Sequence, residues 1–268
     1  LIGQEDYLPY QRPPLSKKYM AGEMALERLF LRPKEFYQDK SIELQIGKSA
    51  LKIDPNQQRV EFSDGSLKYD HLVLSTGSKP RELPTYNSRK IKNLFTMRDL
   101  IDANSIEAFM KSGMRLLIVG GGYIGLEAAA TARKFGVDVT LVEIEERILK
   151  RVAAKETSDY IRSLHISNGV KIKEAIGLDK LEIVDEKVVS ASLTDGSDIN
   201  VDFVIVGIGI TPNTDLAEGA NLKINNGIFI NEKCQTSVSN IYAAGDCTSF
   251  KYKNTLVRLE SVGNAIDQ

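Results

Sequence analysis

The chain has 268 residues, which is enough for two domains of ordinary size, each with its own hydrophobic core. Its 35 lysines and arginines nearly balance its 36 aspartates and glutamates, and a net charge of −1 indicates neither nucleic acid nor a membrane surface as a partner. No apolar run approaches the length of a membrane span, and only Cys234 and Cys247 are present, which argues against a disulfide-stapled secreted fold. With no signal peptide visible at the start, we expect a cytoplasmic protein.

The first part of the chain combines a proline-stiffened segment with short strands. Residues 1–5 are typical of the end of a strand that is already under way. Residues 11–18 contain two prolines, which cannot join a sheet interior, and they hold Arg12 and Lys17 at a fixed spacing. A solvated basic loop is the alternative interpretation of this segment.

The predicted strands form an internal repeat. A Ser/Thr-Asp-Gly-Ser turn at residues 63–66 is followed by Asp70 and an apolar strand that ends at Gly77. The same turn at residues 194–197 is followed by an aspartate and an apolar strand that ends at Gly209. The repeat predicts two similar nucleotide-binding domains, one inserted into the other, although two hairpins can be similar by chance. Strands are expected at residues 42–46, 59–62, 69–77, 170–175, 181–184, 188–193 and 201–209.

Helices are expected between these strands. An alanine-rich helix at residues 126–135 stops at Gly136, and an amphipathic helix is expected at residues 145–167. Residues 78–98, rich in proline, lysine and arginine, are predicted to form a crossover between domains, followed by a helix at residues 99–111.

The strongest signal is the glycine turn between two apolar strands. Gly120 suits the tight turn, Gly122 lets the backbone approach a pyrophosphate, and Gly125 permits close packing of the helix on the strand. The helix N-terminus then offers unpaired N–H groups to the phosphates. Glu143, at the end of the second strand, can accept both hydroxyls of an adenosine ribose and would repel a 2′-phosphate. The unit therefore predicts a site for NADH rather than NADPH, with an ordinary strand-to-helix turn as the alternative.

The C-terminal part carries a second candidate site. Residues 234–246 form a short strand that runs into small residues and ends at Asp246, which is placed to bond a polyol hydroxyl. Residues 258–265 are typical of the first turn of a helix.

These segments together resemble the flavoproteins that have two dinucleotide-binding domains. The resemblance is closer to the NADH-dependent ferredoxin reductases of oxygenase and cytochrome P450 systems. These are the putidaredoxin- and rubredoxin-reductase-like members of the pyridine nucleotide-disulfide oxidoreductase superfamily. The resemblance implies an α/β fold of two Rossmann-like dinucleotide-binding domains, with the NAD domain inserted into the FAD domain. We expect the FAD domain at residues 1–92, N-terminally incomplete, and 214–268, and the NAD domain at residues 93–213. The matching motifs are residues 12–17, 75–77, 120–127, 207–213, 241–246 and 260–262.

The same resemblance implies roles for individual residues. Lys17 would lie near the flavin and pair with Glu127, and these two are the candidate catalytic residues. Asp246 would bond the ribityl chain, while Tyr123 and Ile124 would border the nicotinamide. The alternatives are that Glu127 only complements the dipole at the first turn of its own helix, and that Tyr123 only packs against its neighbours. The implied cofactor-binding residues are Arg12, Pro13, Lys17, Thr76, Gly77, Arg98, Gly120, Gly122, Tyr123, Ile124, Gly125, Glu127, Glu143, Arg151, Gly209, Asp246, Ser261 and Val262.

Three of these residues have more specific roles in the family. Arg98 would contact the flavin nucleotide, and the helix that begins at residues 260–262 would point its N-terminus at the pyrimidine edge of the flavin. Arg151 could reach the adenine side of NADH or a phosphate, or could be surface charge. An FAD domain of this type begins with its own strand, glycine turn and helix, so we expect the 268-residue polypeptide to bind FAD weakly or incompletely.

The implied reaction is hydride transfer from NADH to FAD, followed by release of single electrons to a ferredoxin or a similar one-electron iron–sulfur carrier. Disulfide reductases of this architecture need a close cysteine pair, which this chain lacks, and Cys234 and Cys247 are expected to be buried small residues. His71 and His165 are isolated, so no metal site is expected. The alternatives are a reductase of a small acceptor (monodehydroascorbate-type, or the NADH-oxidising part of a nitrite reductase) and a non-catalytic NADH-sensing flavoprotein of the apoptosis-inducing-factor type.

Overall fold

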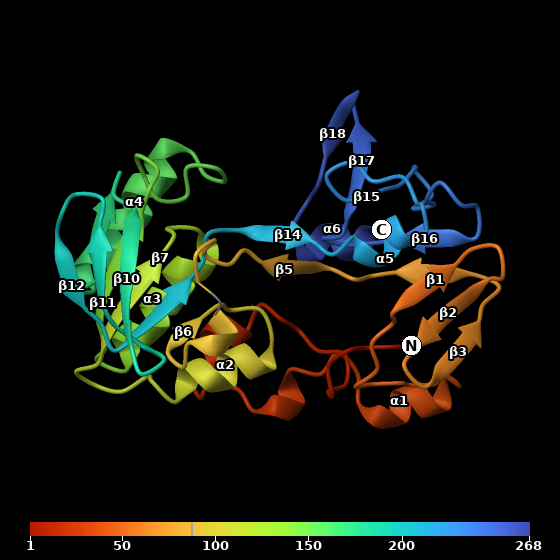
Figure 1. The fold of residues 1–268 in the computed structure, drawn as a ribbon, viewed down its shortest axis with the longest axis horizontal. Helices are drawn as coiled ribbons and strands as arrows, with labels where there is room; N and C mark the ends of the chain where they lie inside the picture. Colours follow the sequence, from red (N-terminus) through yellow and green to blue (C-terminus); the bar gives the residue numbers. More distant parts are fainter. Residues whose placement is uncertain (87) are drawn as a thin grey trace. The chain divides into compact units, whose positions relative to one another are not determined.

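The computed structural model describes residues 1–86 and 88–268 and contains two compact units (Figure 1). Unit 1 consists of Leu1–Tyr10, Leu31–Lys79 and Ile210–Gln268, and unit 2 consists of Gln11–Phe30 and Pro80–Gly209. The chain thus changes unit after Lys79 and Gly209, whereas the sequence placed the domain boundaries after residues 92 and 213. Residues 11–30, which the sequence assigned to the FAD domain, belong to unit 2. Asn87, in the predicted crossover, lies outside the described residues.

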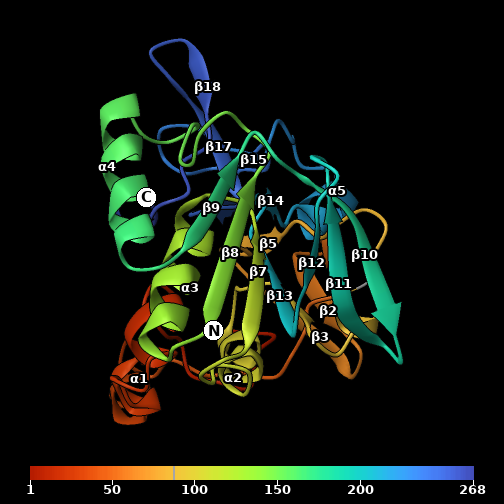
Figure 2. The same ribbon diagram turned by 90° about the vertical axis from the view of Figure 1, so that its left-hand side faces the viewer.

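Unit 2 is built on a five-stranded parallel sheet with the strand order β6-β13-β7-β8-β9. Its strands are β6 (Leu94–Phe95), β7 (Arg115–Val119), β8 (Asp138–Glu143), β9 (Lys171–Glu174) and β13 (Phe203–Val206). The central strands are continuous apolar runs because both faces of the sheet are covered. Figure 2 shows the helices α3 (Tyr123–Lys134) and α4 (Lys155–Ser167) on one face, and the antiparallel strands β10 (Leu178–Val184), β11 (Lys187–Leu193) and β12 (Asp198–Asn200) on the other.

Sequence and structure agree on the alanine-rich helix but differ at its start. Helix α3 begins at Tyr123, three residues before the predicted start at residue 126, because Gly122 is its N-cap. It ends with a C-cap at Phe135, where Gly136 adopts the left-handed conformation with φ of +75°. Helix α2 (Leu100–Glu107) is shorter than predicted and is capped by the Asp99 side chain, which accepts a hydrogen bond from the Asp102 N–H.

The predicted helix at residues 145–167 is wrong in its first part. Helix α4 begins at Lys155, and residues 144–154 form a loop, here called the 144–154 loop. Leu149 has φ of +54°, which a continuing helix does not allow, and its N–H donates to the Gly121 carbonyl over 3.0 Å. The Ile148 N–H donates to Glu174 Oε1 over 2.8 Å. These contacts with residues far along the chain outweigh the local helical pattern.

Unit 1 contains short strands around a core that includes Ile53, Phe62, Leu74, Ile228 and Ile241. The strands β1 (Lys52–Asp54), β2 (Arg59–Phe62) and β3 (Gly65–Lys68) are antiparallel, and β4 (Leu72–Leu74) is parallel to β16 (Ile241–Ala243). The strand β5 (Ser78–Pro80) pairs with β14 (Ile210–Pro212). Of the predicted strand at residues 42–46, the described part of the chain retains one bridge, between Ile2 and Gln45.

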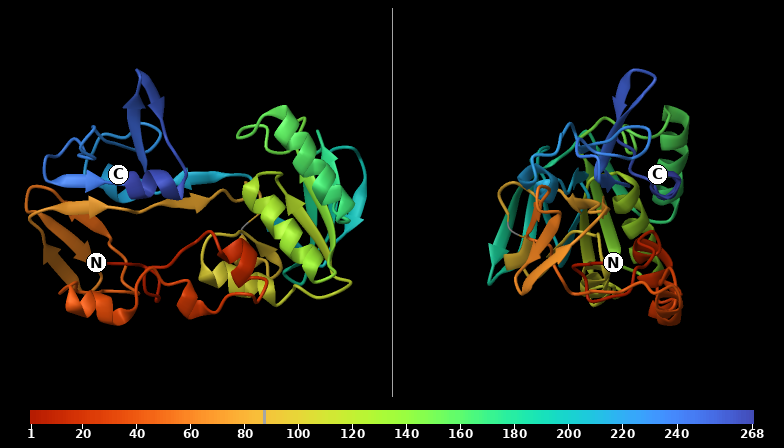
Figure 3. Two further views of the ribbon diagram at one scale, coloured as in Figure 1. Left: turned by 180° about the vertical axis from the view of Figure 1, so that it is seen from behind. Right: turned by 90° about the vertical axis from the view of Figure 1, so that its right-hand side faces the viewer.

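The remaining part of unit 1 includes a projecting hairpin. Strand β17 (Thr248–Tyr252) pairs in parallel with β15 (Ile228–Phe229) and antiparallel with β18 (Thr255–Val257), and the hairpin of β17 and β18 extends from the unit in Figure 3. The helices of unit 1 are α1 (Lys34–Asp39), α5 (Asp215–Gly219) and α6 (Val262–Asp267). Short helical turns of unit 2 lie at η1 (Leu15–Tyr19), η2 (Leu26–Arg28) and η3 (Ser88–Lys90). Within the described residues, no helix combines the length and the apolar character that crossing a bilayer requires.

Candidate functional site

The glycine turn lies at the carboxyl end of β7, where the backbone is too crowded for side chains at two positions. A Cβ atom on Gly120, whose φ is +110°, would lie 2.4 Å from the Gly207 carbonyl oxygen, and a Cβ atom on Gly125 would lie 2.2 Å from the Gly120 carbonyl oxygen. A Cβ atom on Gly122 would meet no described heavy atom within 4 Å. The turn is therefore closed toward the sheet and open at Gly122, the position predicted to face a pyrophosphate.

Helix α3 leaves this turn with an exposed first turn. Gly122 caps the helix without a side chain, so the first N–H groups receive no side-chain acceptor from the cap. Tyr123 is 57% exposed and Ile124 is 39% exposed, although both are large apolar residues. An N-terminus of this kind attracts anions, and the two exposed side chains beside it offer an apolar surface.

Glu143 ends β8 and is fixed against the glycine turn. Its Oε2 atom accepts a hydrogen bond from the Gly121 N–H over 2.7 Å, and its Oε1 atom accepts one from the Glu145 N–H over 2.8 Å. A carboxylate has further lone pairs, so both oxygens can still accept bonds from a ribose. The geometry fits the predicted ribose-binding role.

A polar cluster links η1 with α3 inside unit 2. Lys17 Nζ lies 2.8 Å from Glu127 Oε2, as the family resemblance implied, and the Ser16 hydroxyl donates to the same oxygen over 2.6 Å. One turn further along α3, the Thr131 hydroxyl donates to the Ser16 carbonyl over 2.9 Å. Lys17 Nζ also donates to the Pro13 carbonyl over 3.0 Å. Sequence analysis missed Ser16 and Thr131, although Ser16 stands beside Lys17 in the quoted motif.

Arg12 and Arg98 are joined through backbone groups. The Arg12 side chain donates to the Arg98 carbonyl over 3.0 Å, and the Arg98 N–H donates to Asp102 Oδ2 over 2.7 Å. Burial, together with the nearby charge of Asp99, raises the pKa of Asp102 to about 6. Sequence analysis missed Asp102, whose signal is the Asp99-x-x-Asp102 spacing at a helix start.

In unit 1, the predicted residues lie where two chain segments meet. The Thr76 hydroxyl donates to the Asn213 carbonyl over 2.7 Å, and the Asn213 side chain donates back to the Thr76 carbonyl over 2.8 Å. Gly77 has φ of +63°, which favours glycine. The buried Ser78 hydroxyl donates to Asp246 Oδ2 over 3.1 Å. Asp246 is therefore held in one orientation by a residue that the sequence did not single out.

The last predicted residues lie at a short helix in unit 1 and, in unit 2, beside the second glycine loop (residues 207–209), which follows β13. The Ser261 hydroxyl caps α6 by accepting from the Asn264 N–H over 3.2 Å, and Val262 is 56% exposed. Arg151 lies in the 144–154 loop, and a Cβ atom on Gly209 would lie 3.5 Å from its Nη1 atom. Of the two cysteines, Cys247 is buried as predicted, whereas Cys234 is only partly buried.

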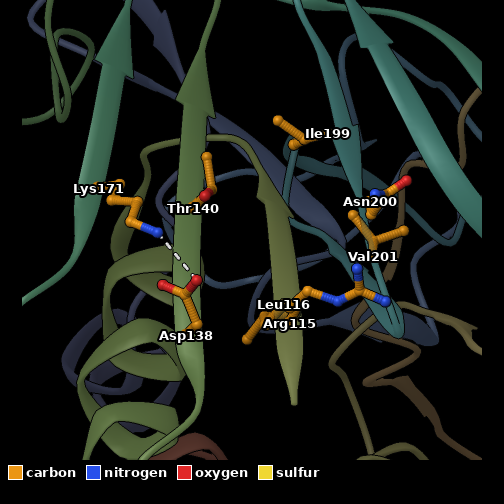
Figure 4. A pocket seen from close by; sticks show the side chains of 8 residues that line it. All are labelled: Arg115, Leu116, Asp138, Thr140, Lys171, Ile199, Asn200 and Val201. Atoms are coloured by element: carbon orange, nitrogen blue, oxygen red, sulfur yellow. Dashed lines mark hydrogen bonds and ion pairs between the residues drawn. The ribbon is translucent and has the colours of Figure 1, made fainter. Parts of the chain in front are cut away.

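A cavity of about 260 Å³ lies at the other edge of the unit 2 sheet, near the amino ends of β7, β8 and β9 (Figure 4). Its charged groups are paired, because Lys171 Nζ lies 2.9 Å from Asp138 Oδ2 and Arg115 Nη2 lies 2.7 Å from Asp202 Oδ1. The Arg115 side chain lowers the pKa of Asp202 by hydrogen bonding. None of the predicted site residues lines this cavity. In the described part of the chain, no group of three or more His, Cys, Asp or Glu side chains could hold a metal ion.

Comparison with known proteins gives one family over the entire chain. Residues 1–268 match the model of the pyridine nucleotide-disulphide oxidoreductases. The rhodocoxin reductase of Rhodococcus erythropolis is 40% identical, over 100% of this chain and 63% of its own length. The putidaredoxin reductase of Pseudomonas putida is 42% identical, over 100% of this chain and 65% of its own length. The chain thus spans a little less than two thirds of these relatives.

Solved structures agree with these sequence matches. A putidaredoxin reductase in covalent complex with putidaredoxin superposes with a TM-score of 0.96 at 41% identity, covering 100% of this chain and 66% of that one. An NAD-dependent persulfide reductase from A. fulgidus superposes with a TM-score of 0.92 at 25% identity, covering 100% of this chain and 52% of that one. The matches confirm the predicted α/β fold class of FAD- and NAD(P)-binding proteins.

Proposed function

The chain belongs to the pyridine nucleotide-disulphide oxidoreductase family, and we propose that it provides NADH-dependent electron transfer to a ferredoxin-type iron–sulfur protein. FAD and NAD(H) are the cofactors of the family, as predicted. In the proposed reaction, a hydride passes from NADH to FAD, and the electrons then leave one at a time. The observation that carries the proposal is the identity of 40–42%, over the whole chain, with the reductases of rhodocoxin and putidaredoxin.

The glycine turn of unit 2 supports the NADH half of the proposal. The open position at Gly122 gives a diphosphate access to the backbone, and the α3 N-terminus stabilises its charge. Glu143 is held by two backbone N–H groups, and its remaining lone pairs accept the ribose hydroxyls. A 2′-phosphate would meet this fixed carboxylate, so we propose that NADH is preferred to NADPH.

Lys17 and Glu127 are the residues proposed to act beside the reacting rings. FAD, when bound, accepts the hydride and releases single electrons. The ion pair keeps the ammonium group of Lys17 in place, and the Ser16 hydroxyl fixes the carboxylate that holds it. In unit 1, Thr76 and Asp246 would contribute to holding FAD, and the bond from Ser78 presents Asp246 in a defined orientation.

Cysteine chemistry gives no support to a disulfide or persulfide substrate. The persulfide reductase of the same fold is only 25% identical to this chain. Both cysteines of the chain, Cys234 and Cys247, are free thiols in unit 1. Neither lies in residues 11–18, where Lys17 pairs with Glu127. Within residues 1–86 and 88–268, no cysteine pair lies beside Lys17.

Anaerobic stopped-flow spectroscopy with excess FAD tests the proposal. We expect NADH to bleach the flavin band faster than NADPH does, and a [2Fe–2S] ferredoxin to reoxidise the flavin in one-electron steps. Lys17→Ala should slow flavin reduction, while Lys18→Ala, an exposed neighbour of equal charge, should not. Faster turnover with a disulfide than with any iron–sulfur protein would refute the proposal that the electron acceptor is an iron–sulfur protein. Slow reduction with a long-lived charge-transfer band would favour the non-catalytic alternative.

A further inference from the structure

Two asparagines of the chain are followed directly by glycine, Asn168 in unit 2 and Asn226 in unit 1. An asparagine side chain can react with the backbone nitrogen of the next residue, and glycine permits this reaction best because it has no Cβ atom to shield that nitrogen. The reaction requires a side-chain amide that is free to turn and a backbone nitrogen that is free to attack. The hydrogen bonds of each pair decide whether both requirements are met.

The pair in unit 2 meets neither requirement. Asn168 is the C-cap of α4, and its side-chain Nδ2 atom donates to the Leu164 carbonyl over 2.8 Å. The Gly169 N–H donates to the Ile166 carbonyl over 2.9 Å. The Arg133 side chain holds the peptide group between the two residues by donating to the Asn168 carbonyl over 3.0 Å. Although Asn168 is exposed, its amide group and the nitrogen that would attack it are both bonded to other groups.

The pair in unit 1 meets both requirements. Asn226 is exposed and lies in a tight turn with φ of +54°. The turn is closed around it by the Asn225 N–H, which donates to the Gly227 carbonyl over 2.8 Å. Within residues 1–86 and 88–268, the Asn226 side chain and the Gly227 N–H form no hydrogen bond. Loss of the Gly227 proton therefore costs no hydrogen bond, whereas loss of the Gly169 proton breaks one.

The backbone on both sides of this turn is packed tightly. Gly227 has φ of +136°, and a Cβ atom on it would lie 2.9 Å from the Cys247 carbonyl oxygen. The same oxygen accepts a hydrogen bond from the Ile228 N–H over 2.8 Å, where the pairing of β15 with β17 begins. The Ser249 hydroxyl donates to the Asn225 carbonyl over 2.6 Å. The turn is thus fixed on both sides to β17 and to the residue before it.

We propose that Asn226 is a site of spontaneous deamidation. The Gly227 nitrogen forms a bond to Asn226 Cγ, the bond from Cγ to Nδ2 breaks, and ammonia leaves with the proton that the Gly227 nitrogen gives up. Water then opens the imide ring at either carbonyl carbon, which gives aspartate or isoaspartate. Each event adds one negative charge to unit 1 at neutral pH. The inference goes beyond the proposed function, because neither a coenzyme nor an electron acceptor takes part.

The two products differ in what they do to the turn. Aspartate keeps the length of the backbone, whereas isoaspartate carries the main chain through the side-chain carbon and lengthens it by one carbon atom. Because Gly227 is already packed against the Cys247 carbonyl, the longer turn has to weaken the bonds that fix it to β17. Isoaspartate at this position therefore lowers the thermal stability of unit 1.

Peptide mass spectrometry of the whole folded chain, sampled during incubation at mildly alkaline pH, tests the inference. Trypsin separates the two sites, because cleavage after lysine or arginine places Asn168 in the peptide of residues 163–171 and Asn226 in that of residues 224–233. We expect Asn226 to deamidate at least about tenfold faster than Asn168, since hydrogen bonds hold both the amide of Asn168 and the N–H that follows it. In denaturing urea both sites should react at similar rates, because these bonds are lost.

Asn225→Gln and Asn226→Gln are matched variants, because both positions are exposed and lie in the same turn. Labelling of the peptide of residues 224–233 by an isoaspartate methyltransferase should persist in Asn225→Gln and disappear in Asn226→Gln. Equal rates for Asn168 and Asn226 in the folded wild-type chain would overturn the inference. So would a folded chain in which Asn226 does not react, or labelling of this peptide that survives Asn226→Gln.

Thermal unfolding tests the consequence for unit 1. The isoaspartate-containing fraction of an incubated sample should unfold at a lower temperature than freshly purified Asn226→Asp. That variant carries the same added charge on a backbone of ordinary length, so the comparison isolates the extra carbon atom. Equal unfolding temperatures would refute the expected strain in the turn.

Discussion

Asp102 offers the most direct test of the physical description of unit 2. Its carboxyl group is mostly buried and accepts the Arg98 N–H, and burial together with the charge of Asp99 raises the pKa to about 6 from its ordinary value of 3.8. Folded protein therefore binds this proton more tightly than unfolded protein does. Stability must fall as the pH rises from 3.8 toward 6, by roughly 3 kcal/mol in total for a shift of about two units.

Asp102→Asn removes this titration while keeping an oxygen acceptor for the Arg98 N–H. We expect the variant to gain about 2 kcal/mol relative to the wild type between pH 4.5 and pH 8. Urea denaturation followed by circular dichroism at the two pH values measures the difference. Glu107→Gln, at the exposed end of the same helix, is the control. Equal effects of Asp102→Asn at both pH values, or an NMR titration of the Asp102 carboxyl near its ordinary value, would refute the reasoning.

Three further predictions concern the glycine turn and the residues around it. Gly125→Ala should lower the free energy of unfolding of unit 2 by about 1–3 kcal/mol in urea denaturation, since its methyl group would lie 2.2 Å from a backbone oxygen. Gly122→Ala should leave the stability unchanged and lower the affinity for ADP-ribose, measured by calorimetry. Glu143→Ala should lower the affinity for NADH about tenfold and reduce the preference for NADH over NADPH. The preference is measured as the ratio of the flavin reduction rates with the two coenzymes, and an unchanged ratio would contradict the proposed ribose contact. Ser16→Ala should slow flavin reduction less than Lys17→Ala does, because the ion pair to Glu127 remains, and equal slowing would disprove the supporting role of Ser16.

The parts of the fold that the sequence predicted well depend on local patterns. The turn from Gly120 to Gly125 and the acid at Glu143 are defined by neighbours within one strand–helix–strand unit, so residue types alone indicate their geometry. The repeat is also local, and each copy is an antiparallel hairpin followed by a parallel strand, β4 or β13. The family resemblance then supplied the ion pair of Lys17, which composition and spacing do not reveal.

The errors have long-range causes. Residues 145–154 have a helical pattern, yet bonds from this segment to Gly121 and Glu174 hold it as a loop. Residues 42–46 have the composition of a strand but pair with another segment only at one bridge. A strand exists only with a partner, and a pattern within one segment cannot show whether that partner is present. The contact between Ser16 and Glu127, which are 111 positions apart, is likewise invisible in a local pattern, and residues 11–30 lie in unit 2 together with Glu127.

Two of the functional candidates that the sequence missed have one property in common. Thr131 holds the carbonyl of Ser16, and Asp102 holds the N–H of Arg98. In each case one partner is a backbone group, which every residue type carries except for the N–H of proline. Residue identity therefore signals only half of the interaction, and a search for paired side chains cannot find it. Residues of this kind become visible only when the fold brings the backbone group to them, and their contribution is measured by substituting the side chain while the backbone partner stays in place.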